Sequence, residues 1–260
     1  MVKNKVFIAL GFSTLFIMSG CTTIADMAGA DSATLNATSA QSFAKMQQEA
    51  KQKGVLDTSS STYQRIYTIL QRMEPYANQL NRTGQAFQWQ LAVIKSDTLN
   101  AYVAPGGKVV FYTGIVNRLN LSDDEIAAIM GHEMTHALEE HAKNKIGADA
   151  LTNLAIDIGK NYAGQSIGQF GNAAIDLGSQ VGVGLPYSRN LETRADYGGL
   201  MLMAKAGYNP QAALTLWEKM SRAQGNTGVS FLSTHPSNTQ RIAEMKNNLP
   251  AAIAIYNRTR

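Results

Sequence analysis

The feature that most constrains this chain is the pattern His132-Glu133-x-x-His136. In an α-helix, residues four positions apart lie on the same face, so the two imidazoles project to the same side. Two neutral imidazole nitrogens at this spacing can bind one Zn²⁺ ion, and the neighbouring glutamate can take a proton from water as a general base. The pattern therefore predicts a helix that carries a catalytic zinc site.

The residues before the pattern predict where this helix begins. Ser122 and Glu125 have the spacing of a capping box, in which each side chain accepts a hydrogen bond from the other's backbone N–H. Asp123 and Asp124 add negative charge to the first turn, where the helix dipole favours it. Apolar residues then follow at helical spacing. The zinc motif is thus expected inside a helix with a defined start.

The N-terminus has the pattern of an export signal. Lys3 and Lys5 precede an apolar run that ends at Met18, and Ser19-Gly20-Cys21 follows. The apolar run is too short for a membrane span and ends in small residues, so we predict a signal peptide over residues 1–20.

Cys21 is the only cysteine and stands where a bacterial lipobox places the lipid-modified residue. Met18 departs mildly from that pattern, since leucine is commoner at its position. We expect lipidation of Cys21; the alternative is an ordinary signal peptide with an incidental cysteine. Thr22 after the cysteine, rather than aspartate, resembles an outer-membrane lipoprotein signal. We therefore expect a lipid-anchored protein of the bacterial envelope, on the periplasmic face of the outer membrane.

The charge of the exported chain argues against a nucleic-acid partner. Residues 1–20 include two of the lysines and no acidic side chain, so their removal leaves 21 basic and 19 acidic side chains. This near-neutral balance offers no electrostatic basis for binding nucleic acid. About 240 residues suffice for one globular domain, and a lone cysteine can form no internal disulfide.

The rest of the chain divides by composition. Residues rich in Ser, Thr, Ala and Asp follow Cys21, and residues 146–185 are rich in Gly, Ala, Ser and Gln with few charges. The latter composition suits closely packed helices or a mobile hairpin beside the active site. The predicted divisions are a signal peptide (1–20), a lipidated N-terminus with a flexible tether (21–45), a metallopeptidase domain (46–250) with a Gly-rich helical insertion (146–185), and a C-terminal tail (251–260). Periodicity predicts helices near 62–80, 190–205, 209–222 and from 237, and strands near 87–95 and 108–113.

A catalytic zinc site needs a third protein ligand. His141 is the nearest candidate, but a metzincin would have glycine and histidine where this chain has Glu139 and Ala142. On a continuing helix, His141 points away from the ligand face, and we expect it to be structural or exposed.

Glu192 and Asp196 form a second candidate, since carboxylates four residues apart share a helix face. One can bind zinc while the other accepts the N–H of a ligand imidazole. The alternative is a solvated acidic face neutralised by Arg189 and Arg194, and spacing alone leaves both interpretations open.

Several separated motifs resemble one protease family. The HExxH and Glu192-x-x-x-Asp196 motifs resemble the HtpX-like gluzincin zinc metallopeptidases, in the soluble bacterial envelope lipoprotein branch typified by LoiP, YcaL and BepA. Further matching blocks are Asn100-Ala-Tyr-Val-Ala-Pro-Gly-Gly107, Thr113-Gly-Ile115, Ala206-Gly-Tyr-Asn-Pro210 and Thr234-His-Pro-Ser237 with Arg241. The resemblance implies that His132, His136 and Glu192 bind one zinc ion per chain, that Glu133 is the base, and that Asp196 orients a histidine.

The resemblance also implies the fold and the substrate strand. We expect an α+β, mainly helical, zincin-like domain with a small β-sheet whose edge strand flanks the HExxH helix. An extended peptide adds to such an edge. The predicted substrate strand is Lys108-Val109-Val110-Phe111-Tyr112, which directly precedes the motif helix. The alternative is a plain core strand.

His235 precedes Pro236 on a loop, and the resemblance places it by the zinc. Two hypotheses follow. His235 donates a hydrogen bond to the oxyanion with help from Arg241, or it occupies a fourth zinc position at rest and is displaced on activation. A loop histidine without a role is the third interpretation.

The predicted function is zinc-dependent endoproteolysis of misfolded or mis-assembled envelope proteins, with outer-membrane assembly machinery as a candidate partner. The main alternative is a chaperone-like lipoprotein with a largely latent zinc site. A weaker one is a zinc hydrolase of a non-protein envelope polymer such as peptidoglycan.

Overall fold

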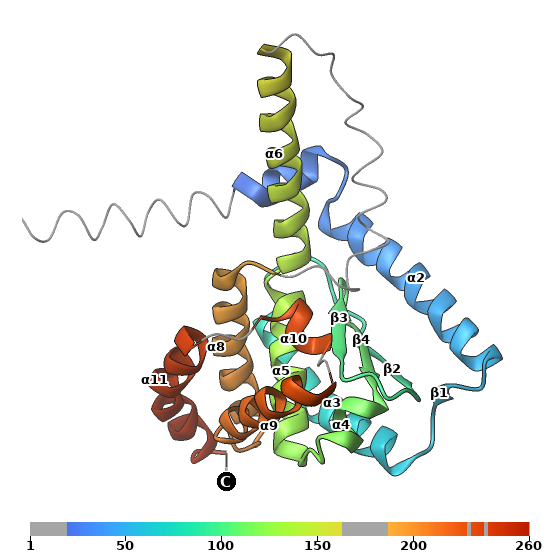
Figure 1. Ribbon diagram of the computed structural model, residues 1–260, viewed down its shortest axis with the longest axis vertical. Helices are drawn as coiled ribbons and strands as arrows, with labels where there is room; N and C mark the ends of the chain where they lie inside the picture. The colour runs from blue at the N-terminus through green and yellow to red at the C-terminus, as the bar shows by residue number, and fades with distance from the viewer. Residues whose placement is uncertain (1–19, 163–186, 228–229, 237–238, 260) are drawn as a thin grey trace, which may run out of the picture.

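The computed structural model describes residues 20–162, 187–227, 230–236 and 239–259 (Figure 1). The predicted signal peptide therefore lies outside the described residues, apart from Gly20, as does the second half of the Gly-rich insertion. The expected α+β, mainly helical fold is confirmed: helices surround one small sheet. Within the described residues, no helix combines the length and the apolar character needed to cross a membrane.

The sheet has four strands in the order β1-β2-β4-β3. The strands are β1 (Leu56–Asp57), β2 (Gln90–Ile94), β3 (Ala101–Ala104) and β4 (Lys108–Tyr112). β2 and β4 run parallel, and the other neighbours are antiparallel. β3 and β4 form a hairpin whose turn contains Gly106 and Gly107, both with φ in the left-handed region that favours glycine.

This topology corrects the predicted substrate strand. Lys108–Tyr112 is β4, which pairs with β2 on one side and β3 on the other, so neither of its edges is open to a peptide. Val109, Val110 and Phe111 are fully buried, as suits an interior strand. The edge strand beside the motif helix is β3.

The motif helix α5 (Asp123–Leu138) lies at the centre of the domain (Figure 1). The predicted capping box is present at its start. Around it pack α3 (Ser61–Leu80), α8 (Arg189–Lys205) and α9 (Ala212–Thr227), with β3 against its other side. Short helices α4 (Thr113–Arg118) and α10 (Ser230–Thr234) link these elements.

A glycine pair sets the spacing between α5 and α8. A Cβ on Gly131 would lie 2.7 Å from the Gly199 carbonyl oxygen, and a Cβ on Gly199 would lie 2.7 Å from the His132 nitrogen. The two backbones are therefore in direct contact, and any larger residue at either position would separate the helices. This close approach brings the histidines of α5 to the carboxylates of α8.

The N-terminal segment differs from the predicted flexible tether. Residues 20–27 are helical, and α2 (Ser32–Gln52) begins at the N-cap Asp31. Phe43 of α2 packs with Ala92 and Val110 against the sheet, which explains why this segment is ordered. Residues 20–27 lie against α6 (His141–Tyr162), where a Cβ on Gly147 would collide with the backbone of Cys21.

The C-terminus also differs from the prediction. α11 (Thr239–Tyr256) continues through Pro250, so most of the predicted tail 251–260 belongs to a helix that packs on α8. Ala252 is completely buried on its inner face.

Candidate metal centre and active site

Three predicted ligands converge between α5 and α8. His132 Nε2 and His136 Nε2 are 3.0 Å apart. Each is 3.5 Å from a carboxylate oxygen of Glu192. All three side chains are buried. Their convergence follows from the four-residue spacing on α5 and from the glycine contact between the two helices.

His235, which directly follows α10, completes the cluster. Its Nδ1 lies 3.0 Å from Glu192 Oε1 and 3.1 Å from His132 Nε2. The ring of Phe231 stacks on His235 with centroids 4.5 Å apart, and the His235 N–H bonds to the Phe231 carbonyl. The loop histidine is thus held in place by α10 rather than free.

The donor set fits a zinc ion. One atom from each of His132, His136, Glu192 and His235 lies within 4.8 Å of all the others. In a tetrahedral zinc site the ligand atoms lie about 3.3 Å apart, close to the separations seen here. Among the described residues no hydrogen bond satisfies Glu192 Oε2, although the Arg241 guanidinium lies 2.7 Å away. A buried carboxylate oxygen that lacks a hydrogen-bond partner is suited to binding a metal ion.

The electrostatics keep His136 neutral and Glu192 charged. Burial, followed by the nearby His132 and His235, lowers the pKa of His136 well below its usual value, and a neutral imidazole is the form that binds metal. Burial opposes ionisation of Glu192, but the His235 hydrogen bond and neighbouring positive charges outweigh it and lower its pKa.

Asp196 supports His132 from the far side of the ring. Asp196 Oδ1 is 3.0 Å from His132 Nδ1, the nitrogen that faces away from the cluster. Arg241 donates to both oxygens of Asp196 at 2.7 Å. Burial opposes ionisation of Asp196, but hydrogen bonds from Arg241 and His132 lower its pKa, so it accepts as a carboxylate.

Glu133 differs from these carboxylates because it is buried and poorly satisfied. Burial raises its pKa, against the opposing influence of His235 and His132. Its Oε1 lies 3.3 Å from His235 Nε2, but this one oxygen accepts no hydrogen bond from the part of the chain that the structure describes. The Val103 backbone N–H of β3 bonds to the carboxylate. A carboxylate of raised pKa beside a metal cluster is suited to proton transfer.

Comparison with known proteins agrees with this site. The sequence model of Peptidase family M48 matches residues 60–249. The chain belongs to peptidase family M48. This is a family of zinc-dependent metalloproteases, so the HtpX-like resemblance and the zinc prediction are confirmed.

The individual relatives are proteases from eukaryotes and from bacteria. The chain is 38% identical to the mitochondrial metalloendopeptidase OMA1 of Schizosaccharomyces pombe, over 64% of this chain and 48% of that protein. It is 25% identical to the metalloprotease LoiP of Escherichia coli, over 78% of this chain and 77% of LoiP. The β-barrel assembly-enhancing protease of E. coli O157:H7 is also 25% identical, over 71% and 38%. The chain spans about half or less of the length of the OMA1 relatives it matches.

In this M48 chain, Arg241 contacts the carboxylates of the cluster. Its guanidinium is buried, donates to Asp196 and to the Pro236 carbonyl, and lies 2.7 Å from Glu192. The Trp217 ring covers it with its centroid at 4.5 Å. Arg241 therefore holds the carboxylates of the metal centre.

The sequence analysis missed two neighbours of His136. The ring of Tyr187 stacks on the His136 ring at 4.2 Å between centroids. His141, expected to point away, is completely buried with its Nδ1 2.8 Å from His136 Nδ1. The prediction for His141 assumed a continuous helix, whereas α5 ends at Leu138 and α6 begins at His141.

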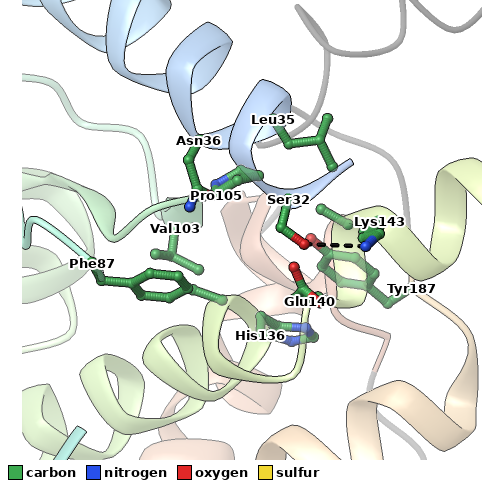
Figure 2. Close-up of a pocket in the computed structure, with 12 residues that line it drawn as sticks. Ser32, Leu35, Asn36, Phe87, Val103, Pro105, His136, Glu140, Lys143 and Tyr187 are labelled. Carbon is green, nitrogen blue, oxygen red and sulfur yellow. Dashed lines mark hydrogen bonds between the residues drawn. The ribbon is translucent and has the colours of Figure 1, made fainter. Parts of the chain in front are cut away.

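A small cavity of about 20 Å³ lies beside His136 (Figure 2). Val103 and Pro105 from the β3 hairpin, Tyr187, and Ser32 and Leu35 from α2 form its walls. Lys143 of α6 bonds to the Ser32 hydroxyl across its mouth at 3.1 Å. The α2 wall precedes the residues matched by the M48 family.

Cys21 lies in the helical residues 20–27, half-buried, as a free cysteine. Asp26 of the same segment pairs with Lys143 at 2.7 Å.

Proposed function

We propose that this chain is a zinc-dependent endopeptidase of the bacterial envelope. The observation that carries the proposal is Glu133, a buried carboxylate of raised pKa with an unsatisfied oxygen, beside a four-ligand cluster in an M48 domain. A structural zinc site has four protein ligands and needs no carboxylate for proton transfer.

The proposed chemistry assigns one task to each residue. His132, His136 and Glu192 would hold a zinc ion, which would supply Lewis acidity toward a carbonyl oxygen and a water molecule. Glu133 takes a proton from the attacking water and returns it to the leaving amine. Asp196 and Arg241 keep the His132 ring and Glu192 oriented.

The peptide is proposed to add to β3 rather than to β4. The Tyr112 N–H bonds to the Asn100 carbonyl, so the antiparallel alternation directs the backbone groups of Ala101 and Val103 away from β4. The Val103 N–H bonds to Glu133 in this structure, so a strand added here would take over that N–H and run past the proposed base.

The proposed setting is quality control at the outer membrane, with lipid attached at Cys21 and with misfolded or mis-assembled envelope proteins as substrates. The likeness to LoiP and to a protease named for β-barrel assembly supports this setting. The lipobox pattern supports the anchor. Outer-membrane assembly machinery is the proposed partner.

The test compares wild type with Glu133→Gln on casein and on denatured porin, with the zinc content of both proteins determined. We expect cleavage by wild type only and one zinc ion in each. Equal cleavage, or a zinc-loaded wild type that cleaves neither protein, would sink the proposal.

His235 supports a second candidate, a chaperone-like lipoprotein whose site is latent. Its Nδ1 sits at the fourth corner of the donor set, where it would occupy the position that substrate or water needs. A His235→Ala variant distinguishes the hypotheses. Activity rises if His235 blocks the site and falls if its Nε2 serves the oxyanion, while unchanged kinetics would contradict both.

A further inference from the structure

His141 is a completely buried histidine that the proposed chemistry does not use. Its Nδ1 lies 2.8 Å from Nδ1 of His136, and its Nε2 lies 3.1 Å from Glu139 Oε2. Arg194 of α8 contacts the same Glu139 oxygen at 2.6 Å through Nε. These four side chains form an unbroken series of contacts from the metal cluster to the outer part of α8.

A break between two helices produces this arrangement. Glu140 has a φ of 50°, in the left-handed region, and it separates α5 from α6. This change in chain direction places the His141 ring against the His136 ring. On a continuous helix the His141 ring would point to a different face. Asn144 stabilises the break, because its amide donates to the carbonyls of Glu139 and Glu140.

The contacts leave one consistent assignment of protons. His136 Nε2 faces the other ligands, so a neutral His136 that binds metal there carries its proton on Nδ1. That Nδ1–H must then donate to His141 Nδ1, which leaves the proton of His141 on Nε2. The Nε2–H donates to Glu139, whose charge Arg194 balances. Both imidazole N–H groups of the series therefore point away from the metal cluster, toward Glu139.

The other histidine ligand has the same kind of support. His132 Nδ1 contacts Asp196, which Arg241 holds at two oxygens. In both series a ligand imidazole is connected to a carboxylate and then to an arginine. The difference is that His136 reaches its carboxylate through a second imidazole.

We propose that His141 is a positioning residue that fixes the orientation and the proton of His136, and so sets the affinity of this site for zinc. The inference rests on the metal site of the proposed function but not on peptide cleavage. Loss of an outer partner of a metal-bound histidine typically weakens metal binding about 10–100-fold.

Two substitutions separate positioning from simple packing. His141→Phe retains the bulk of the ring but cannot accept a hydrogen bond. His141→Asn loses bulk, yet its Oδ1 takes the place of Nδ1 and can accept from His136. Thr135→Val is the matched control: Thr135 is buried at the same end of α5, and among the described residues its hydroxyl bonds to the Gly131 carbonyl of its own helix alone.

The measurement is zinc affinity in solution, by competition with a chromophoric chelator, on the full chain without substrate. We expect His141→Phe to lower the affinity about 10–100-fold, and His141→Asn and Thr135→Val to stay within about threefold of wild type. Wild-type affinity in His141→Phe, or equal losses in Phe and Asn variants that fold, would overturn the proposal.

Glu139→Gln keeps the proposal testable if His141→Phe does not fold. This change removes the carboxylate that receives the His141 proton, and we expect a loss of about 3–10-fold in zinc affinity with His141 intact. An unchanged zinc affinity would contradict the proposal that Glu139 supports His136 through His141. Because no peptide is present, failure of the endopeptidase proposal would leave these results unaffected.

Discussion

Two glutamates on α5, two helical turns apart, behave in opposite ways. Glu125 and Glu133 are both almost completely buried. Glu125 accepts hydrogen bonds from the Ser122 N–H, from Thr215 and from Lys219. Burial opposes its ionisation, but these donors together lower its pKa, whereas burial raises the pKa of Glu133. The helix thus has one carboxylate whose charge is fully compensated and one whose charge is not, and only the second lies beside the metal cluster.

The largest expected effect is on catalysis at Glu133. Glu133→Gln removes the proposed base and should lower kcat about 10²–10⁴-fold, the usual contribution of general-base catalysis. The midpoint of thermal unfolding should not fall, because the amide removes an uncompensated buried charge. Steady-state kinetics with a quenched peptide and a thermal melt on the same sample test both statements. A lower melting midpoint at unchanged kcat would contradict this contrast.

Glu125→Gln should have the reverse effect. The amide can still face Thr215, but the charge that Lys219 and the helix N-terminus stabilise is lost. We expect the free energy of unfolding in urea to fall by about 1–3 kcal/mol, with kcat/KM of the folded protein within about threefold of wild type. A large loss of activity in Glu125→Gln at unchanged unfolding free energy would contradict the assignment of Glu125 to stability and Glu133 to catalysis.

The stabilisation by Glu125 should depend on pH. The pKa of Glu125 in the folded protein lies below the usual glutamate value of 4.5, so the contribution is present above the unfolded-state pKa. It disappears as the pH falls through the lower folded-state pKa. The difference in unfolding free energy between wild type and Glu125→Gln should therefore be constant from about pH 6 to 8 and shrink below about pH 4.5. A difference that grows on acidification would contradict the assigned direction.

Ser122→Ala should have the smallest effect. It removes the hydroxyl that accepts from the Glu125 N–H at 3.2 Å but leaves the Glu125 side chain bonded to Lys219 and Thr215. Loss of an N-cap typically costs about 1 kcal/mol, and zinc content should not change. Urea unfolding and metal analysis of this variant serve as the check. A loss larger than that of Glu125→Gln would place the dominant stabilisation in the cap rather than in the charge.

Local spacing explains which parts were predictable. The HExxH pair, the capping box and the Glu192/Asp196 pair each lie within one helix, where sequence separation determines the shared face. The predicted orientation of His141 was wrong because Glu140 adopts a left-handed backbone without a glycine or proline that would signal a helix break. Nothing in the sequence near residue 140 indicates the reversal.

The predicted substrate strand was wrong because the order of strands in a sheet depends on pairing between residues far apart in the sequence. The order of strands is a property of the whole sheet, and β4 lies inside it because β2 pairs with the second strand of the hairpin rather than the first.

The segment 21–45 was predicted to be a tether from its small polar residues. Leu35 and Phe43 of α2 are eight residues apart, a helical spacing that marks the face buried in the structure.

The packing of residues 20–27 against α6 has a consequence for how far the enzyme can work from its support. Under the proposed attachment at Cys21, the acyl chains would begin at a helix seated on the domain, where Asp26 pairs with Lys143 and the Cys21 backbone meets Gly147. No flexible linker would then separate the lipid from the domain. The active site would therefore be held at a fixed height and a fixed tilt above the bilayer. Clients would then have to come within that fixed distance, which favours chains stalled at the lipid surface over chains diffusing through the bulk periplasm.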